Sequence, residues 1–351
     1  MAEAQPLVRN RALARTAKAG ALIAIAIAAL FGFLAACVTP ATLKALTLER
    51  PEMAQLDPQN NRMVSFDGAE LGLTVWSPEA DPDIVIVGVH GMNDYANAFH
   101  MAAPYWAKKG VKTYAYDQRG FGRSVGRGDW PDEEVMREDL RTAVRLARAQ
   151  HPDAVLAVVG ISMGGAMTMT AFGSAAPPEG VDRVVFSGPG LRGWGTIPVV
   201  QRDARWGSGR VGPGWGVRPP RCGIIEPSDN VEMLRRLWAD PLGIKTNKIE
   251  QVHGVVSLME NAHRAAPDLP TEIPMLLTYG AKDIVIPERG LRRTARKLPE
   301  HVRTAYYPDG YHMLLRDLQA ELVFEDVLTF LRDPNAALPS GVGEVPGRNV
   351  G

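Results

Sequence analysis

Gly160-Ile161-Ser162-Met163-Gly164 is the stretch of the sequence that decides the fold. An apolar run, residues 154–159, precedes it, and a small-residue segment of helical character, residues 165–176, follows it. A serine between two glycines where a strand turns into a helix is typical of a nucleophile elbow, and an ordinary loop is the alternative. Glycine is required there because the turn is tight and the strand and helix approach closely. We therefore predict that Ser162 is a nucleophile at the carboxyl edge of a parallel sheet.

Composition limits the classes of protein to which this chain can belong. It has 351 residues, of which 46% are hydrophobic, and can therefore bury a full core in one large α/β domain or two small ones. Basic and acidic residues balance at 39 each, so nothing indicates binding to nucleic acid. The only cysteines, Cys37 and Cys222, exclude a disulfide framework, and no metal-ligand spacing occurs.

The first 36 residues resemble the signal peptide of a bacterial lipoprotein. Four basic residues precede an uncharged stretch at residues 19–36 that is rich in Ala, Leu and Ile. The stretch ends in Leu34-Ala35-Ala36-Cys37, which is similar to a lipobox. The resemblance implies cleavage before Cys37 and a diacylglycerol on its thiol. An uncleaved membrane anchor is the alternative, because eighteen uncharged residues nearly span a bilayer.

Both interpretations place the bulk of the chain outside the cytoplasm, in the cell envelope and tied to a membrane. Val38 is not the aspartate that is linked to inner-membrane retention in enteric bacteria, which favours the periplasmic side of the outer membrane. An uncleaved anchor would instead hold the protein in the inner membrane. Residues 37–61 are expected to form a linker to the folded domain.

Alternating strand and helix patterns cover residues 62–333 and predict an α/β domain with a mostly parallel sheet flanked by helices. The turn pair Asp67-Gly68 between two apolar runs predicts a hairpin. The β-branched run at residues 84–89 predicts a strand that is buried on both faces. The tail, residues 334–351, is rich in Gly and Pro and is expected to be disordered.

A long interruption, at about residues 188–250, is expected to form a cap or lid. Its first part, residues 188–223, holds ten glycines and five prolines, so much of it cannot be regular helix. Two interpretations of its tryptophans stay open: they pack the insert onto the sheet, or they form an apolar lid over an acyl-binding groove. These tryptophans are Trp194, Trp206, Trp215 and Trp238.

A serine nucleophile needs a base, and the base needs an acid that orients it. In the elbow architecture the chain order is serine, acid, histidine. Asp283 and His312 each follow a predicted strand, so both are expected at the edge that carries Ser162. Asp309 is the rival acid, but it is so near His312 in sequence that orienting the ring would need an unusual turn.

Acyl transfer also needs hydrogen-bond donors for the negative charge that develops on the substrate. The elbow supplies the backbone N–H of Met163. The loop after the third predicted strand, His90-Gly91-Met92, is expected to supply the N–H of Met92, while His90 braces that loop.

The ordered set of motifs resembles the α/β-hydrolase superfamily, and more narrowly its monoacylglycerol lipase and lysophospholipase (serine aminopeptidase-like) branch. The motifs are H-G-M at 90–92, D-x-R-G-x-G-x-S at 117–124, G-x-S-M-G-G at 160–165, Asp283, and G-Y-H at 310–312. The resemblance covers about residues 64–331. It implies hydrolysis of monoacylglycerols, lysophospholipids or other lipid esters by a serine mechanism that uses neither metal nor cofactor.

Other functions fit the same motifs. Dehalogenases and epoxide hydrolases carry an aspartate at the elbow, so Ser162 excludes them. A short-chain esterase, a thioesterase, a peptidase and a non-catalytic envelope binding protein remain as alternatives. One departure from the family concerns Met92-Asn93, where many relatives have a small residue and glycine. Bulk at this position would narrow the acyl or alcohol site.

Overall fold

The structure of the protein is a computed structural model, and it describes residues 44, 53–196, 216–217 and 226–348. The predicted signal peptide at 1–36, the predicted lipidation site Cys37, and Trp206 and Trp215 lie outside the described residues. Within the described ranges, no helix combines the length and the apolar character that a membrane crossing requires.

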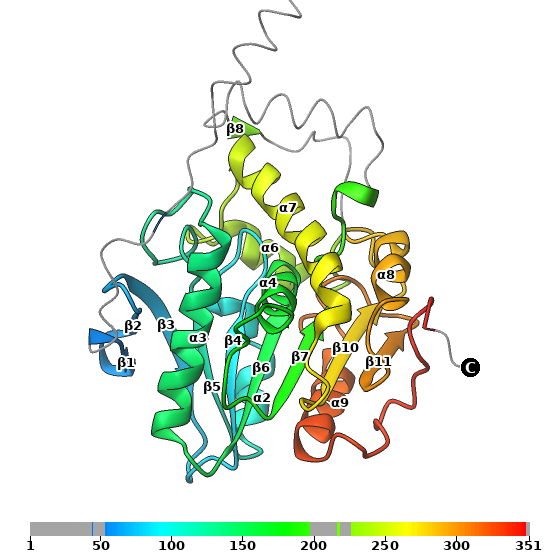
Figure 1. Cartoon of the computed structure of the whole chain (residues 1–351), viewed down its shortest axis with the longest axis horizontal. Helices are drawn as coiled ribbons and strands as arrows, with labels where there is room; N and C mark the ends of the chain where they lie inside the picture. Colours follow the sequence, from blue (N-terminus) through cyan, green and yellow to red (C-terminus); the bar gives the residue numbers. More distant parts are fainter. Residues whose placement is uncertain (1–43, 45–52, 197–215, 218–225, 349–351) are drawn as a thin grey trace, which may run out of the picture.

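A nine-stranded sheet, in the order β1-β2-β3-β5-β4-β6-β7-β10-β11, forms the centre of the described fold (Figure 1). The first three strands pair antiparallel with their neighbours, and every pairing from β5 to β11 is parallel. The strands are β1 (Gln55–Asp57), β2 (Arg62–Val64), β3 (Glu70–Trp76), β4 (Ile84–Val89), β5 (Val111–Tyr116), β6 (Val155–Ile161), β7 (Arg183–Ser187), β10 (Met275–Gly280) and β11 (Val302–Tyr307).

The sheet confirms the mostly parallel α/β fold that the sequence predicts. All six residues of β4 are buried, as expected of a central strand that is covered on both faces. β2 and β3 form the predicted hairpin, and Gly68 adopts a φ of +83° in its turn, a value that glycine accepts without strain.

Helices cover both faces of the sheet (Figure 1). Those on one face share a core with the sheet and include α3, α4, α7 and α8, whereas α2 and α9 pack on the opposite face. The helices are α2 (Ala102–Ala107), α3 (Glu133–Gln150), α4 (Met163–Phe172), α6 (Val231–Ala239), α7 (Ile249–Ala265), α8 (Glu288–Ala295) and α9 (Ala320–Arg332).

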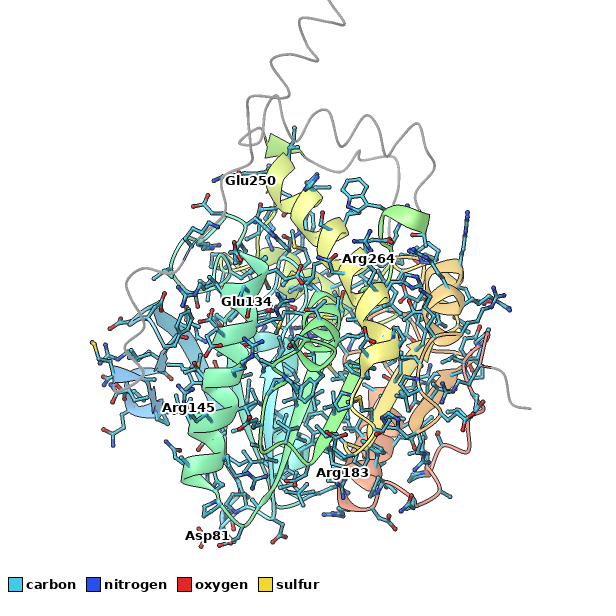
Figure 2. All side chains as sticks on the ribbon, viewed as in Figure 1. Asp81, Glu134, Arg145, Arg183, Glu250 and Arg264 are labelled. Atoms are coloured by element: carbon cyan, nitrogen blue, oxygen red, sulfur yellow. The ribbon has the colours of Figure 1, made fainter. Side chains whose placement is uncertain are left out.

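Helices α3 and α7 carry charged side chains on the surfaces that face away from the sheet. Glu134 and Arg145 project from α3 and Arg264 from α7, and all three are exposed (Figure 2). Leu140 and Val144 on the opposite side of α3 are buried in the core against the sheet. This separation explains why the 3.6-residue apolar period of α3 predicts the helix from sequence.

Both ends of the domain differ from the sequence expectations. The sheet begins with β1, within residues 37–61, which were expected to be a linker. The expectation of a disordered tail is wrong for residues 334–348, which run beside the edge strand β11. There the Tyr306 N–H donates to the Gly343 carbonyl at 2.9 Å, and Val345 is buried. The open edge of β11 offers backbone partners that a composition rich in Gly and Pro does not reveal.

The D-x-R-G-x-G-x-S segment is structural, and its centre is a buried ion cluster. Arg119 donates two hydrogen bonds to Asp67 and two to Asp139, at 2.7–2.8 Å. No more than 1% of any of the three side chains is exposed. The cluster ties the turn of the β2–β3 hairpin to α3 and to the loop after β5.

Replacing Arg119 with methionine should therefore leave two carboxylates buried without their cation. We expect Arg119→Met to lower the free energy of unfolding by about 3–5 kcal/mol. Urea denaturation of the variant and the parent protein measures the difference. Arg292→Met is the matched control, since Arg292 is half exposed and pairs with Glu288 on the surface of α8. Its expected loss is below about 1 kcal/mol, and equal losses in the two variants would contradict the role of the cluster.

Candidate active site

Ser162 lies at the turn from β6 into α4 in a conformation that non-glycine residues rarely adopt. Its φ is +52° and its ψ is −116°. The turn is possible because its neighbours lack side chains: a Cβ on Gly164 would collide with the carbonyl oxygens of Val89 and His90, and a Cβ on Gly160 would collide with the first turn of α4. The local sequence thus presents the serine hydroxyl at the carboxyl edge of the sheet.

The structure brings Ser162, His312 and Asp283 into one chain of hydrogen bonds. Nε2 of His312 lies 2.9 Å from Oγ of Ser162, and Nδ1 lies 2.7 Å from Oδ2 of Asp283. An ionised carboxylate only accepts, so Nδ1 carries the proton and Nε2 is free to accept from the serine hydroxyl. His312 and Asp283 are both buried, with 6% of each residue exposed, which keeps water from competing for these bonds.

The loops that carry the acid and the histidine are tied together by their backbones. Gly280 lies against the carbonyl groups of Gly310 and Tyr311 with no room for a Cβ, and the Lys282 N–H donates to the Gly310 carbonyl at 2.9 Å. The other oxygen of Asp283 accepts from two N–H groups of its own loop, those of Val285 and Ile286, at 2.8 and 2.9 Å. These contacts fix the direction in which Asp283 faces the imidazole.

Asp309, the rival acid, points away from the histidine. It binds the ammonium of Lys282 at 2.7 Å, and 71% of its side chain is exposed. Sequence proximity to His312 therefore does not place this carboxylate beside the ring.

The loop after β4 runs beside the serine and is braced by His90. Nδ1 of His90 lies 2.7 Å from the Gly91 carbonyl and acts as donor, while Nε2 accepts from the Gln118 N–H at 2.8 Å. Burial lowers the pKa of His90, which keeps the ring neutral and allows one nitrogen to donate and the other to accept. Gly91 approaches Ser162 so closely that a Cβ on it would lie 3.2 Å from the serine Cβ.

The two backbone donors predicted for an oxyanion lie on elements that meet at the serine. Met163 is the first residue of α4, so its N–H has no intrahelical acceptor. Met92 follows Gly91 and lines the same pocket as Ser162 and His312.

The pocket at the serine lies next to an apolar groove that is lined by α6. The pocket has a volume of about 360 Å³ and the groove about 570 Å³, and the two share Met92, Asn93, Asp94, Pro227 and Met313 in their walls. Leu234 and Leu237 of α6 and Ile244 form much of the remaining apolar wall of the groove.

Residues 227–244, which we call the α6 segment, are bound at both ends to the loops around the serine. At its start, the Pro227 carbonyl accepts from the Met313 N–H at 2.8 Å. At its end, Asp240 accepts from the Tyr95 hydroxyl at 2.7 Å, and the Ile244 N–H donates to the Asn93 carbonyl at 3.0 Å. The segment therefore connects the loop of His312 with the loop of Met92.

The two tryptophans of the insert that the structure describes differ in their surroundings. Trp194 packs against α7, where its indole N–H donates to the Ser257 hydroxyl at 3.1 Å and its ring lies beside His253. Trp238 on α6 is 72% exposed and lines the groove. Trp194 is thus a packing residue, whereas the role of Trp238 as part of an apolar lid stays a prediction.

Asp317 is a buried carboxylate near His312 that the sequence does not identify. One of its oxygens accepts from the Tyr311 N–H at 2.8 Å and from the Ser228 hydroxyl, and the other has no partner in the described structure. Burial raises the pKa of Asp317 to about 6 despite these bonds, and the nearby Asp229 acts in the same direction while His312 opposes it. It joins the histidine loop to the α6 segment, a contact between distant positions that no local motif marks.

Comparison with known proteins gives relatives over most of the chain. Residues 80–319 match the family model described as serine aminopeptidase S33. A monoacylglycerol lipase of Mycolicibacterium smegmatis is 31% identical over 269 residues, which cover 75% of this chain and 93% of that protein.

Solved structures show the same fold. A monoacylglycerol lipase of Paleococcus ferrophilus superposes with a TM-score of 0.63 at 22% identity, covering 75% of this chain and 98% of that one. A soluble variant of the monoglyceride lipase of Saccharomyces cerevisiae gives a TM-score of 0.65 at 18% identity, covering 85% of this chain and all of that one.

The raised pKa of Asp317 predicts a pH-dependent stability. An unfolded aspartate has a pKa near 3.9, so between about pH 4 and 6 the folded protein binds the additional proton, and its stability falls as pH rises through this window. Asp317→Asn keeps an acceptor and cannot ionise. We therefore expect its unfolding free energy, relative to the parent, to increase between pH 4 and 7 by on the order of 2–3 kcal/mol.

Chemical denaturation at pH 4, 5, 6 and 7 measures this difference. Asp309→Asn, at the exposed aspartate of the same loop, is the control variant. A parallel pH profile for Asp317→Asn and the parent would show that Asp317 ionises normally in the folded protein.

Proposed function

The chain belongs to the serine aminopeptidase S33 family of α/β hydrolases and is a serine ester hydrolase, and on that premise we propose that it cleaves lipid esters of the monoacylglycerol or lysophospholipid type. The observation that carries the proposal is the hydrogen-bonded chain Ser162–His312–Asp283 in a pocket that shares wall residues with an apolar groove. The similarity to monoacylglycerol lipases over three quarters of the chain supports the same substrate class.

The first half of the proposed reaction forms an acyl-enzyme. Nε2 of His312 accepts the proton of the Ser162 hydroxyl while Oγ attacks the ester carbonyl carbon. The N–H groups of Met92 and Met163 bind the resulting oxyanion. Asp283 holds the tautomer of His312 and stabilises the imidazolium. His312 then gives its proton to the alcohol oxygen as the bond between acyl carbon and alcohol breaks.

The second half returns the enzyme to its starting state. His312 takes a proton from water, the hydroxide attacks the acyl carbon, and the same two backbone donors bind the second oxyanion. The imidazolium returns the proton to Oγ of Ser162 as the acyl bond breaks and the carboxylic acid leaves. All proton transfers pass through one nitrogen, Nε2, which needs the geometry of 2.9 Å to the serine oxygen.

The groove lined by α6 is the proposed site for the acyl chain. Its walls are mostly apolar, and it begins beside Met92, which borders the pocket of the serine. Burying each methylene of an acyl chain contributes about 0.8 kcal/mol. A groove of this volume therefore favours longer chains over acetyl esters.

We propose further that the protein acts in the cell envelope, anchored by a lipid on Cys37. The support is the lipobox-like sequence at residues 34–37 and the basic residues before it. An anchor of this kind would keep the catalytic domain beside the bilayer that contains its substrates.

Removing the nucleophile should abolish turnover, and removing the orienting acid should lower it strongly, without unfolding the protein. We expect Ser162→Ala to eliminate hydrolysis of octanoyl esters and labelling by a fluorophosphonate. Asp283→Asn should lower kcat by about 10³–10⁴-fold, because the carboxamide favours the wrong tautomer of His312 and cannot stabilise its imidazolium. The control is Asp309→Asn, which should retain near-parental kcat. Substantial turnover by Ser162→Ala, or equal loss in both aspartate variants, would refute the assigned roles.

A charged side chain in the groove should slow the hydrolysis of long-chain esters more than that of acetyl esters. Leu234 lines the groove, so Leu234→Glu is expected to lower kcat/KM for dodecanoyl esters by at least about tenfold, the transfer energy of two methylenes. Hydrolysis of acetyl esters should be nearly unchanged. Arg236→Glu is the control on the exposed face of the same helix. A uniform loss for all chain lengths in Leu234→Glu would place the acyl chain elsewhere.

A further inference from the structure

The loop that carries His312 has no regular secondary structure of its own. It comprises residues 308–319, between β11 and α9, and the structure describes all of them and places none in a helix or a strand. Before the histidine, the Lys282 N–H holds the loop at the Gly310 carbonyl. The rest of the loop needs a second anchor, because a reacting group on a loop keeps its place only through the contacts that support it.

That second anchor is the start of the α6 segment. The Met313 N–H, directly after the histidine, donates to the Pro227 carbonyl at 2.8 Å. The Leu318 N–H donates to Oδ1 of Asp229 at 2.8 Å. Two backbone donors of the histidine loop are thus paired with residues that lie far earlier in the chain.

Asn230 binds the helix and the histidine loop at the same time. Its side-chain oxygen accepts from the Met233 N–H at 3.1 Å and caps the start of α6. Its side-chain nitrogen donates to the Arg316 carbonyl at 3.0 Å. A substitution that keeps the cap and deletes the amide nitrogen would therefore release the loop without weakening the start of the helix.

Asp317 closes the loop around the histidine. One of its oxygens accepts from the Tyr311 N–H, directly before His312, at 2.8 Å, and also from the Ser228 hydroxyl of the α6 segment. Only 1% of Asp317 is exposed, and its other oxygen has no hydrogen-bond partner in the described structure. Burying a carboxylate with an unpaired oxygen costs free energy, and residues with such a cost are expected at functional sites.

We propose that Asp317 and Asn230 are positioning residues that hold the loop of His312 so that Nε2 stays within reach of the Ser162 hydroxyl. This inference rests on the proposed function, in which His312 is the base. In the described structure neither residue lines the serine pocket or the groove, so both act through the loop and not on the substrate. The role of Asp317 is to accept two hydrogen bonds, and a neutral acceptor of the same shape can fill it.

The first test uses two variants of the full-length protein with 4-nitrophenyl octanoate as substrate. The measured quantities are KM and kcat, with kcat divided by the number of serines that a fluorophosphonate labels at completion. Asp317→Ala deletes both bonds and should lower kcat by about 10–100-fold with KM nearly unchanged, since a displacement of about 1 Å at a reacting group can cost about 10²-fold. Asp317→Asn keeps the accepting oxygen and should retain kcat within about threefold of the parent.

A matched control separates positioning from a general loss of stability. Asp326 is also a buried aspartate, and it accepts from the Tyr307 hydroxyl at 2.6 Å and from the Ser340 N–H at 2.9 Å. Asp326→Ala should lower the urea midpoint of unfolding and leave kcat per labelled serine at the parental value. Equal losses of kcat in the two alanine variants would overturn the role of Asp317.

The second test, Asn230→Ser, decides the matter even if Asp317→Ala does not fold. Serine caps a helix about as well as asparagine but has no amide nitrogen for the Arg316 carbonyl. The variant should lower kcat per labelled serine by about three- to tenfold, the effect of one hydrogen bond. Asp132→Ser makes a similar exchange at the cap of α3, lines neither the serine pocket nor the groove, and should leave kcat unchanged.

The outcomes distinguish this inference from the proposed function. Parental kcat in Asp317→Ala or in Asn230→Ser would show that the α6 segment does not position the base, and the ester hydrolase would stand. A loss in Asp317→Asn as large as in Asp317→Ala would overturn the role as a neutral acceptor. A folded parent protein that hydrolyses no octanoyl ester would overturn the proposed function, and the positioning roles with it.

Discussion

The left-handed turn at Ser162 is the constraint on which the surrounding structure depends. Holding a serine at φ +52° costs on the order of 1–3 kcal/mol, and it persists only because neighbouring contacts over-determine it. Gly164 allows α4 to approach the end of β4, and Gly91 allows the following loop to approach the serine. The same close packing that strains Ser162 therefore also positions the loop of Met92.

The α6 segment depends on this arrangement and also links its two halves. It is hydrogen-bonded to the histidine loop through Pro227 and to the other wall of the pocket through Asp240 and Ile244. An acyl chain in the groove would contact the same segment. The proposed acyl site and the placement of His312 and Met92 thus share one structural element.

The sequence predicts those parts of the fold that are encoded locally. The β-branched run of β4, the period of α3 and the turn at Ser162 each follow from a few adjacent residues. The position of Asp283 near Ser162 could also be predicted, because Asp283 follows a strand and the carboxyl ends of parallel strands meet at one edge of the sheet. The pairing of Asp94 with Arg316 and the role of Asp317 could not be predicted, because their partners are distant in sequence and no residue spacing marks them. The prediction of a disordered tail fails for the same reason, because the order of the tail depends on its contact with the open edge of β11, which is distant in sequence.

Two histidines near the serine show how partners set the chemistry of one residue type. The ring of His90 is buried between a carbonyl and a backbone N–H, so burial lowers its pKa and it serves as a neutral brace. The ring of His312 faces the Asp283 carboxylate at 2.7 Å and the serine hydroxyl at 2.9 Å. A carboxylate on one side stabilises the imidazolium that forms when the other side takes a proton. The position of one aspartate therefore decides which histidine can act as a base and which can only hold a loop in place.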